Sequence, residues 1–287
     1  MKIKVAIPHF LGKEKKEKHD FNLPADWVPG SARGNIEKRE RSFQRCLWSL
    51  VHSAMLNQYV VHDLLGDRFV RIEEPIQQHE ISIRVTIDGY NISERVLGLY
   101  RDYIEVHEVR LEDSRNLVFE AREDLLDSTD CDYDLFVYCE DDIGFSPPNF
   151  FERIAWFAEC SKQLGVLMPH RFENPELPDI ERAYIDGSIY RGLLDKFQTL
   201  ELNALELKYG DQSIVFDKPT NPHSAMFCVT KAQRDLVVSK GVQRRNDLVR
   251  EFESVATLTV LEFFDVYKTD WRNRNFLQVE HLFTNYC

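Results

Sequence analysis

The sequence predicts an α/β fold in which helices cover both faces of a mostly parallel central sheet. Strand-like and helix-like segments alternate through the first 165 residues, and the strand-like segments are short apolar runs. Such alternation is typical of parallel strands joined by crossover helices. The alternation loosens after residue 165. We therefore expect one domain, residues 1–287, in which a smaller subregion, 166–287, is built onto the sheet of the first half, 1–165.

Four strands are expected in the first half, at residues 2–8, 81–90, 103–109 and 135–139. The first strand, KIKVAIP, is a β-branched run. The fourth, LFVYC, is apolar throughout, as expected for a strand that is buried on both faces. The second strand ends at Asp88-Gly89, a dipeptide that is common in turns.

Helices are expected between these strands. Asn35 can cap a first helix, because apolar residues follow it at helical spacing from Phe43 to Ala54. Residues 113–128 predict a second helix, and Pro147-Pro148 suits the first turn of a third. The segment 11–34 contains the charge run KEKKEKHD, so we expect a mobile or functional loop that becomes ordered when a ligand binds.

The second half is less regular in pattern. GVLMPHRFE is expected to form a strand, and NPHSAMFCV a turn that enters a strand. Residues 174–222 are expected to be irregular, with short β-like runs. Two helices are predicted, one in KAQRDLVVSKG, which Gly241 ends, and a longer one in NDLVREFESVATLTVLEFF.

Composition narrows the classes of function. The formal net charge of −12 argues against a nucleic-acid partner, because such proteins present basic surfaces. The sequence contains no run of 18 apolar residues, so we expect no transmembrane helix. The N-terminus has the pattern of a strand and lacks that of a signal peptide. The six cysteines include no CxxC pair, so we expect reduced thiols. We expect a cytoplasmic protein, with a peripheral position at the inner face of a membrane as the alternative.

Three consecutive acids, Glu140, Asp141 and Asp142, directly follow the fourth strand. Like charges this close repel each other, whereas a bound Mg²⁺ or Mn²⁺ ion selects such hard oxygen ligands. Ligands of parallel α/β sheets bind at the carboxyl ends of the strands, where Asp88 is also expected. The sequence therefore predicts a Mn²⁺ or Mg²⁺ site at this edge, and a solvated strand end is the alternative.

The E-D-D motif in this series of strands and helices resembles the nucleotide-sugar glycosyltransferases of the GT-A fold, whose D-x-D metal motif follows the fourth strand. VAIPHF, RSFQRCLWSL, VTIDGY and RNLVFEAR are similar to that fold's first strand, first helix, second strand and a nucleotide-contacting helix. The resemblance covers most of residues 1–165. It implies an enzyme that transfers a sugar from a UDP- or GDP-linked donor to a hydroxyl acceptor, such as a glycan.

The resemblance also implies roles for individual residues. Asp142 and the C-terminal His281 would bind the metal, although a structural, half-buried histidine is the alternative for His281. A simple turn is the alternative for Asp88. The residues implied to bind the nucleotide sugar are Pro8, His9, Asp88, Arg122, Glu140 and Asp141.

On the acceptor side, the family pattern points to an acid near the start of a helix in the second half. Glu253 would take the proton of the acceptor hydroxyl, with Glu251 as its competitor and a solvated helix acid as the alternative. His223 and Ser224 would contact the acceptor, unless their segment is only a turn. The sequence does not decide between inversion and retention.

Two other functions compete with this interpretation. A sugar-1-phosphate nucleotidyltransferase needs a glycine-rich loop of the type GGxGxR after the first strand, and this chain has LGKEKKEKHD there. A non-catalytic carbohydrate- or partner-binding module could share the sheet, but it would have no reason to keep the acids.

Overall fold

The computed structural model describes residues 1–11, 35–54, 59–72, 79–127, 129, 132–146, 149–175, 177–187, 194–248 and 250–283. Its central sheet has the order β13-β6-β1-β4-β5. These strands are β13 (Met226–Thr230), β6 (Leu135–Cys139), β1 (Lys2–Pro8), β4 (Glu80–Ile87) and β5 (Ile104–Glu108). All neighbouring pairs are parallel except β13 and β6. The predicted mostly parallel sheet is confirmed, and β1 and β6 have the predicted bounds.

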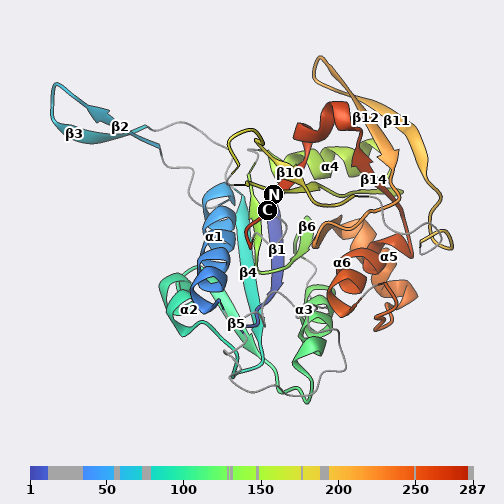
Figure 1. Cartoon of the computed structure of the whole chain (residues 1–287), viewed down its shortest axis with the longest axis horizontal. Coiled ribbons are helices and arrows are strands. Elements are labelled where there is room, and N and C mark those ends of the chain that lie inside the picture. Colours follow the sequence, from blue (N-terminus) through green and yellow to red (C-terminus); the bar gives the residue numbers. More distant parts are fainter. Residues whose placement is uncertain are drawn as a thin grey trace.

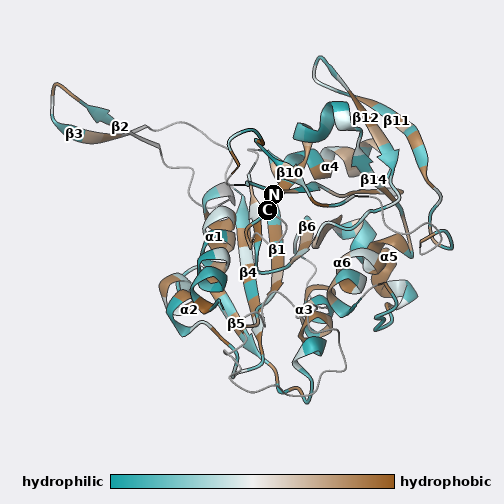
Figure 2. Ribbon diagram, viewed as in Figure 1, coloured by the Kyte–Doolittle hydropathy of each residue, from teal (hydrophilic) through white to brown (hydrophobic). Residues whose placement is uncertain are grey.

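Helices cover both faces of this sheet (Figure 1). One face carries α1 (Ile36–Ala54) and α2 (Glu94–Tyr100), and the other carries α3 (Leu117–Leu125), α5 (Lys231–Lys240) and α6 (Glu251–Leu261). Residues of β1 alternate between the two cores, since Ile3, Val5 and Ile7 pack with α1 and Ala6 packs with α3 and α6. Figure 2 shows that β1 is largely hydrophobic. Burial on both sides explains why apolar residues follow one another without alternation from Val5 to Ile7.

Helix ends follow the sequence signals. The side-chain Oδ1 of Asn35 accepts a hydrogen bond from the Lys38 amide at 2.9 Å, so the predicted cap of α1 is confirmed. Thr230 and Gln233 form a reciprocal capping box at the start of α5. Gly241 ends α5 with a φ of 77°, a conformation that glycine adopts without a Cβ penalty.

Two smaller four-stranded sheets build the second half. One has the order β10-β9-β15-β7 and the other β11-β12-β14-β8. Strand β7 follows the three acids directly and pairs with β15, so the C-terminal strand lies beside them. The bounds are β7 (Ile143–Phe145), β8 (Gly165–Leu167), β9 (His170–Glu173), β10 (Ala183–Tyr184), β11 (Glu201–Tyr209), β12 (Gln212–Lys218), β14 (Asp265–Thr269) and β15 (Gln278–His281).

Several elements differ from the sequence predictions. GVLMPHRFE forms two strands, β8 and β9, in different sheets, because Pro169 lacks the N–H that a continuous strand would use. The helix expected at 113–128 is a 3₁₀ turn, Ser114–Asn116, followed by the shorter α3. The hairpin of β2 (Tyr59–Asp63) and β3 (Arg68–Ile72) was not predicted. Helix α4 (Phe150–Cys160) begins after the predicted proline pair, and Trp271–Phe276 forms a further 3₁₀ turn.

Only Leu11 of the loop predicted at 11–34 belongs to the described residues, and the rest of that loop lies outside them. Within the described ranges, no helix is both long and apolar enough to cross a membrane.

Candidate active site

The three acids lie where the strand order reverses. Strand β1 sits between β4 and β6, and all three run parallel. The chain therefore adds strands first to one side of β1 and later to the other. Ligands of open α/β sheets bind at the carboxyl ends of the strands at such a switch point. Here β1 ends at Pro8, and β6 ends at Cys139, immediately before Glu140.

Asp141 is held by two side chains from the first half. His9 donates from Nδ1 to Asp141 Oδ2 at 2.7 Å, and Arg39 donates from Nη2 to Oδ1. The Ser93 amide donates to His9 Nε2 at 3.1 Å, which places the proton on Nδ1, and the His9 ring stacks on Phe43. Burial works to raise the pKa of Asp141, but the charge of Arg39 and the His9 bond outweigh it and hold that pKa below its ordinary value. Asp141 is thus a compensated buried anion.

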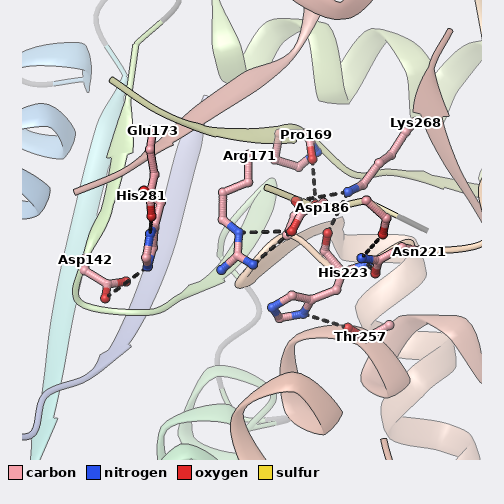
Figure 3. Close-up of polar contacts among 12 residues, drawn as sticks. Asp142, Pro169, Arg171, Glu173, Asp186, Asn221, His223, Thr257, Lys268 and His281 are labelled. Carbon is pink, nitrogen blue, oxygen red and sulfur yellow. Dashed lines mark hydrogen bonds and ion pairs between the residues drawn. The ribbon is translucent and has the colours of Figure 1, made fainter. Parts of the chain in front are cut away.

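Asp142 is only partly compensated. Arg39 Nη1 donates to its Oδ2 at 2.9 Å, but its Oδ1 is buried without a hydrogen-bond partner among the described residues. Nε2 of His281 lies 3.6 Å from Oδ2, which is longer than a hydrogen bond. On its other side, His281 donates from Nδ1 to Glu173 Oε1 at 2.6 Å. Figure 3 shows Asp142, His281 and Glu173 in a row.

The fit of this arrangement to a divalent cation depends on these donor atoms. Across the described ranges, no point is surrounded by three or more candidate ligands of the His, Cys, Asp or Glu type. His281 Nε2 nevertheless faces Asp142 Oδ2, and the other oxygen of Asp142, Oδ1, is buried without a partner among the described residues. Mg²⁺ is commonly held by one or two carboxylates with substrate phosphates completing the shell. The residues therefore fit a two-ligand site that a bound diphosphate would complete.

Glu140, the first acid of the motif, lies close enough to Glu253 for the two charges to interact. Burial, and then the neighbouring Asp142 charge, raise the pKa of Glu140 well above its ordinary value. Burial also raises the pKa of Glu253, whose Oε2 is buried with no hydrogen-bond partner in the described part of the chain. The Arg171 charge opposes both shifts. Strongly perturbed carboxylates of this kind are frequent at catalytic sites.

A buried polar network lies next to these acids (Figure 3). Arg171 on β9 donates from Nε and Nη2 to one oxygen of Asp186, and Lys268 on β14 lies 3.3 Å from the other. Burial works to raise the pKa of Asp186, but the charges of Lys268 and Arg171 hold that pKa at about 2. Lys268 also donates to the His223 carbonyl at 2.6 Å, and the His223 ring contacts Thr257 of α6 at 3.0 Å. The network thus joins both small sheets to the helix that carries Glu253.

His223 and Ser224, which were predicted to contact an acceptor, lie in the same region. Burial and the nearby Arg171 charge lower the pKa of His223 to about 3, so its ring is neutral at pH 7. Ser224 is fully buried and donates to the Pro169 carbonyl at 2.6 Å. The Ser224 hydroxyl proton is therefore used in a hydrogen bond inside the protein. The His223 ring contacts α6 instead.

Two predicted nucleotide-binding residues have extensive protein partners. Asp88 accepts hydrogen bonds from the amides of Tyr90 and Asn91, from the Asn91 side chain and from Ser114. Burial works to raise the pKa of Asp88, but these hydrogen bonds outweigh it and lower that pKa. Asp88 therefore fixes the turn after β4, and its contact with a nucleotide base stays a prediction.

Arg122 is buried on α3 and donates to the Gln243 carbonyl at 3.1 Å. Burial lowers its pKa below the ordinary value. The contact joins α3 to the segment before α6. The predicted contact between Arg122 and the nucleotide stays a prediction.

Sequence reasoning missed five residues that organise the site. Arg39 lies on an amphipathic helix, where an arginine at a polar-looking position gives no signal of burial. The others come together only through the register of short strands and an irregular loop, so no local pattern marks them. The missed residues are Arg39, Arg171, Glu173, Asp186 and Lys268.

No protein-family model matches the chain, and no curated protein matches it. Among solved structures, S. aureus TarS 1-349 is similar with a TM-score of 0.45 at 10% identity, over 93% of this chain and 58% of that one. Its complex with UDP-GlcNAc gives a TM-score of 0.43 at 10% identity, over 100% of this chain and 62% of that one. The chain thus spans less than two thirds of either structure. At these values the likeness carries no conclusion about function.

Replacing Asp186 tests the charge balance of the network. Asp186→Asn leaves two buried cations without their shared anion, so we expect a loss of about 3–5 kcal/mol in unfolding free energy at pH 7. The pKa of Asp186 is lowered from 3.8 to about 2, so its contribution is present above pH 3.8 and disappears as the pH falls through about 2. The difference from wild type should therefore shrink in acid. Urea denaturation measures this, with exposed Asp195→Asn as control; equal stabilities at pH 7 would contradict the network.

The stability of a Glu253 variant reports the burial of that acid. The raised pKa of Glu253 means that its contribution to stability is present below the ordinary value of 4.5 and is lost as the pH rises through the folded-state pKa. Glu253→Gln lacks this loss, so its stability relative to wild type should increase between pH 4 and pH 8. Glu251→Gln, in the same helical turn, serves as control. A difference that does not change with pH would show that Glu253 is solvated.

Proposed function

We propose that this chain is a glycosyltransferase of the GT-A type that uses a nucleotide-diphosphate sugar and a divalent cation. The observation that carries the proposal is the placement of the E-D-D motif. These acids follow the strand at the switch point of a doubly wound sheet, where ligands of this architecture bind. Two of the acids retain uncompensated charge or unpaired oxygen, which is unfavourable for stability alone.

In the proposed site, Asp142 and His281 hold Mn²⁺ or Mg²⁺ and the donor diphosphate supplies further ligands. When bound, the cation would neutralise the negative charge that grows on the departing diphosphate. Arg39 keeps Asp142 in place through its Nη1 contact and compensates Asp141 through Nη2. A UDP- or GDP-linked donor and a hydroxyl acceptor are the substrates proposed.

Glu253 is the proposed general base. It stands in the first turn of α6, and one of its oxygens is buried without a partner in the described structure. A carboxylate with a raised pKa is better matched to accepting a proton near neutral pH. The neutral His223 ring, one α6 turn away at Thr257, is placed to accept or donate a hydrogen bond to an acceptor hydroxyl without changing the charge of the site.

The Arg39 ion pair favours a second candidate. Because Arg39 already compensates Asp141 and part of Asp142, these acids also have a structural role that needs no metal. A non-catalytic carbohydrate-binding module on the same architecture could keep them for that reason. Metal-dependent nucleotide binding separates the two candidates.

Asp142→Asn tests the metal site. Wild type should gain thermal stability from UDP or GDP only when Mn²⁺ is present, because ligands that bind the folded state raise the unfolding midpoint. The stabilisation is about 2.7 kcal/mol at a ligand concentration of 100 Kd. The variant should lose this shift and keep its fold. Asp132→Asn, in the exposed turn before β6, is the control, and a nucleotide shift that survives EDTA would refute the metal dependence.

Glu253→Gln and His281→Ala separate the base from the metal ligand. Glu253→Gln should keep donor and metal binding while transfer falls by about 10²–10⁴-fold, the usual contribution of a general base. His281→Ala should weaken metal and donor binding, with part of the rate recovered at high Mn²⁺. If Glu253→Gln transferred sugar at the wild-type rate, Glu253 would be a helix acid with no role as the general base.

A further inference from the structure

Glu173 is a buried acid that the proposed reaction does not use directly. It is the last residue of β9, its side chain is 0% exposed, and its Oε1 lies 2.6 Å from His281 Nδ1. An ionisable group is rarely buried to this extent unless it has a specific partner, because losing its water costs several kcal/mol. The contact with His281 therefore indicates the role of Glu173.

Strand register brings Glu173 to this position. Strand β15 pairs with β9 on one side, with Glu280 opposite Phe172, so that His281 comes beside Glu173 at the next position. On its other side β15 pairs with β7, with His281 opposite Ile143, the residue after Asp142. The C-terminal strand thus inserts one histidine between two acids that are distant in sequence. The arrangement follows from the sheet and not from flexible surface side chains.

The hydrogen bond to Glu173 selects one tautomer of His281. A carboxylate oxygen accepts, so Nδ1 carries a proton, and a lone pair can be offered to a metal only by Nε2. That lone pair is directed at Asp142 Oδ2, 3.6 Å away. Asp142 Oδ2 also accepts a hydrogen bond from Arg39 Nη1 at 2.9 Å, whereas Asp142 Oδ1 has no partner among the described residues and would supply the carboxylate ligand of a bound cation. Octahedral metal bonds of about 2.0–2.2 Å place neighbouring ligand atoms roughly 2.8–3.1 Å apart, so the two side chains would move closer together to share a cation.

We propose that Glu173 is a positioning residue of the divalent-metal site, fixing the ring orientation and tautomer of His281 so that Nε2 points at the cation. Metal-binding histidines commonly donate their other N–H to a carboxylate, which orients the ring and increases its basicity as a ligand. The role rests on the metal site of the proposed function. Glu173 on β9 would thus affect metal affinity without contacting the substrate.

Mn²⁺ binding measures this role without an acceptor or any turnover. The electron paramagnetic resonance signal of free Mn²⁺ gives the dissociation constant of the purified full chain. Glu173→Gln should weaken Mn²⁺ binding by about 10–100-fold, the usual effect of losing such a partner. The matched control is Glu152→Gln, which removes the carboxylate partner of another buried histidine, His79, from a part-buried pair at 2.8 Å, and should leave Mn²⁺ affinity unchanged.

A double variant separates positioning from general damage. In a His281→Ala background, Glu173→Gln should cause little further weakening, because its effect passes through the missing ring. Equal weakening in both backgrounds would overturn the proposal. So would wild-type affinity in Glu173→Gln when Asp142→Asn has lost Mn²⁺ binding. If Asp142→Asn binds Mn²⁺ like wild type, the metal site of the proposed function itself fails.

Wild-type protein provides a test that needs no stable Glu173 variant. Nitrogen-15 NMR of labelled histidine distinguishes the two neutral tautomers, and the His281 signal is identified by its loss in His281→Ala. The proposal requires the proton on Nδ1. A His281 ring that carries its proton on Nε2 would refute it.

Discussion

The guanidinium of Arg39 lies against two consecutive buried carboxylates, Asp141 and Asp142, and this contact joins α1 to the carboxyl edge of the central sheet. Without a cation here the strand β6 could not end on buried acids, because each anion would carry an uncompensated desolvation cost. His9 adds a second contact to Asp141 from the end of β1. The first strand, the first helix and the fourth strand of the central sheet are therefore fixed to one another at a single point.

The acids of the site differ in how far neighbouring cations and hydrogen bonds compensate for their burial, and this difference separates two kinds of group. Asp141 and Asp186 each have two cationic or hydrogen-bonding partners, and both have lowered pKa values. Glu140 and Glu253 have raised pKa values, and one oxygen of Asp142 has no partner in the described structure. Groups of the first kind stabilise the fold. Groups of the second kind reduce stability, and such groups are most often retained where a ligand or a proton transfer compensates for the cost.

Sequence patterns predicted the parts of the fold that depend on local chemistry. A β-branched run gave the bounds of β1 and a wholly apolar run those of β6, and Asn35 and Gly241 marked helix ends, because these signals act within a few residues. The resemblance placed His281 near Asp142, and the structure brings the two within 3.6 Å. The roles of Arg171, Asp186 and Lys268 could not be predicted from the sequence. These residues lie on β9, in the loop after β10 and on β14, and the three segments come together only through long-range strand pairing.

The three acids looked equivalent in sequence, but their surroundings divide them into distinct roles. Asp141 turns toward β1 and α1, where Arg39 and His9 occupy its oxygens. Glu140 lies toward Arg171 and Glu253, in the half that would face an acceptor. One oxygen of Asp142 accepts from Arg39, and the other has no partner among the residues that the structure describes. A run of like charges is therefore tolerated because successive residues face different partners, and Asp142 is the acid of the three whose partners leave one oxygen unpaired within the described residues.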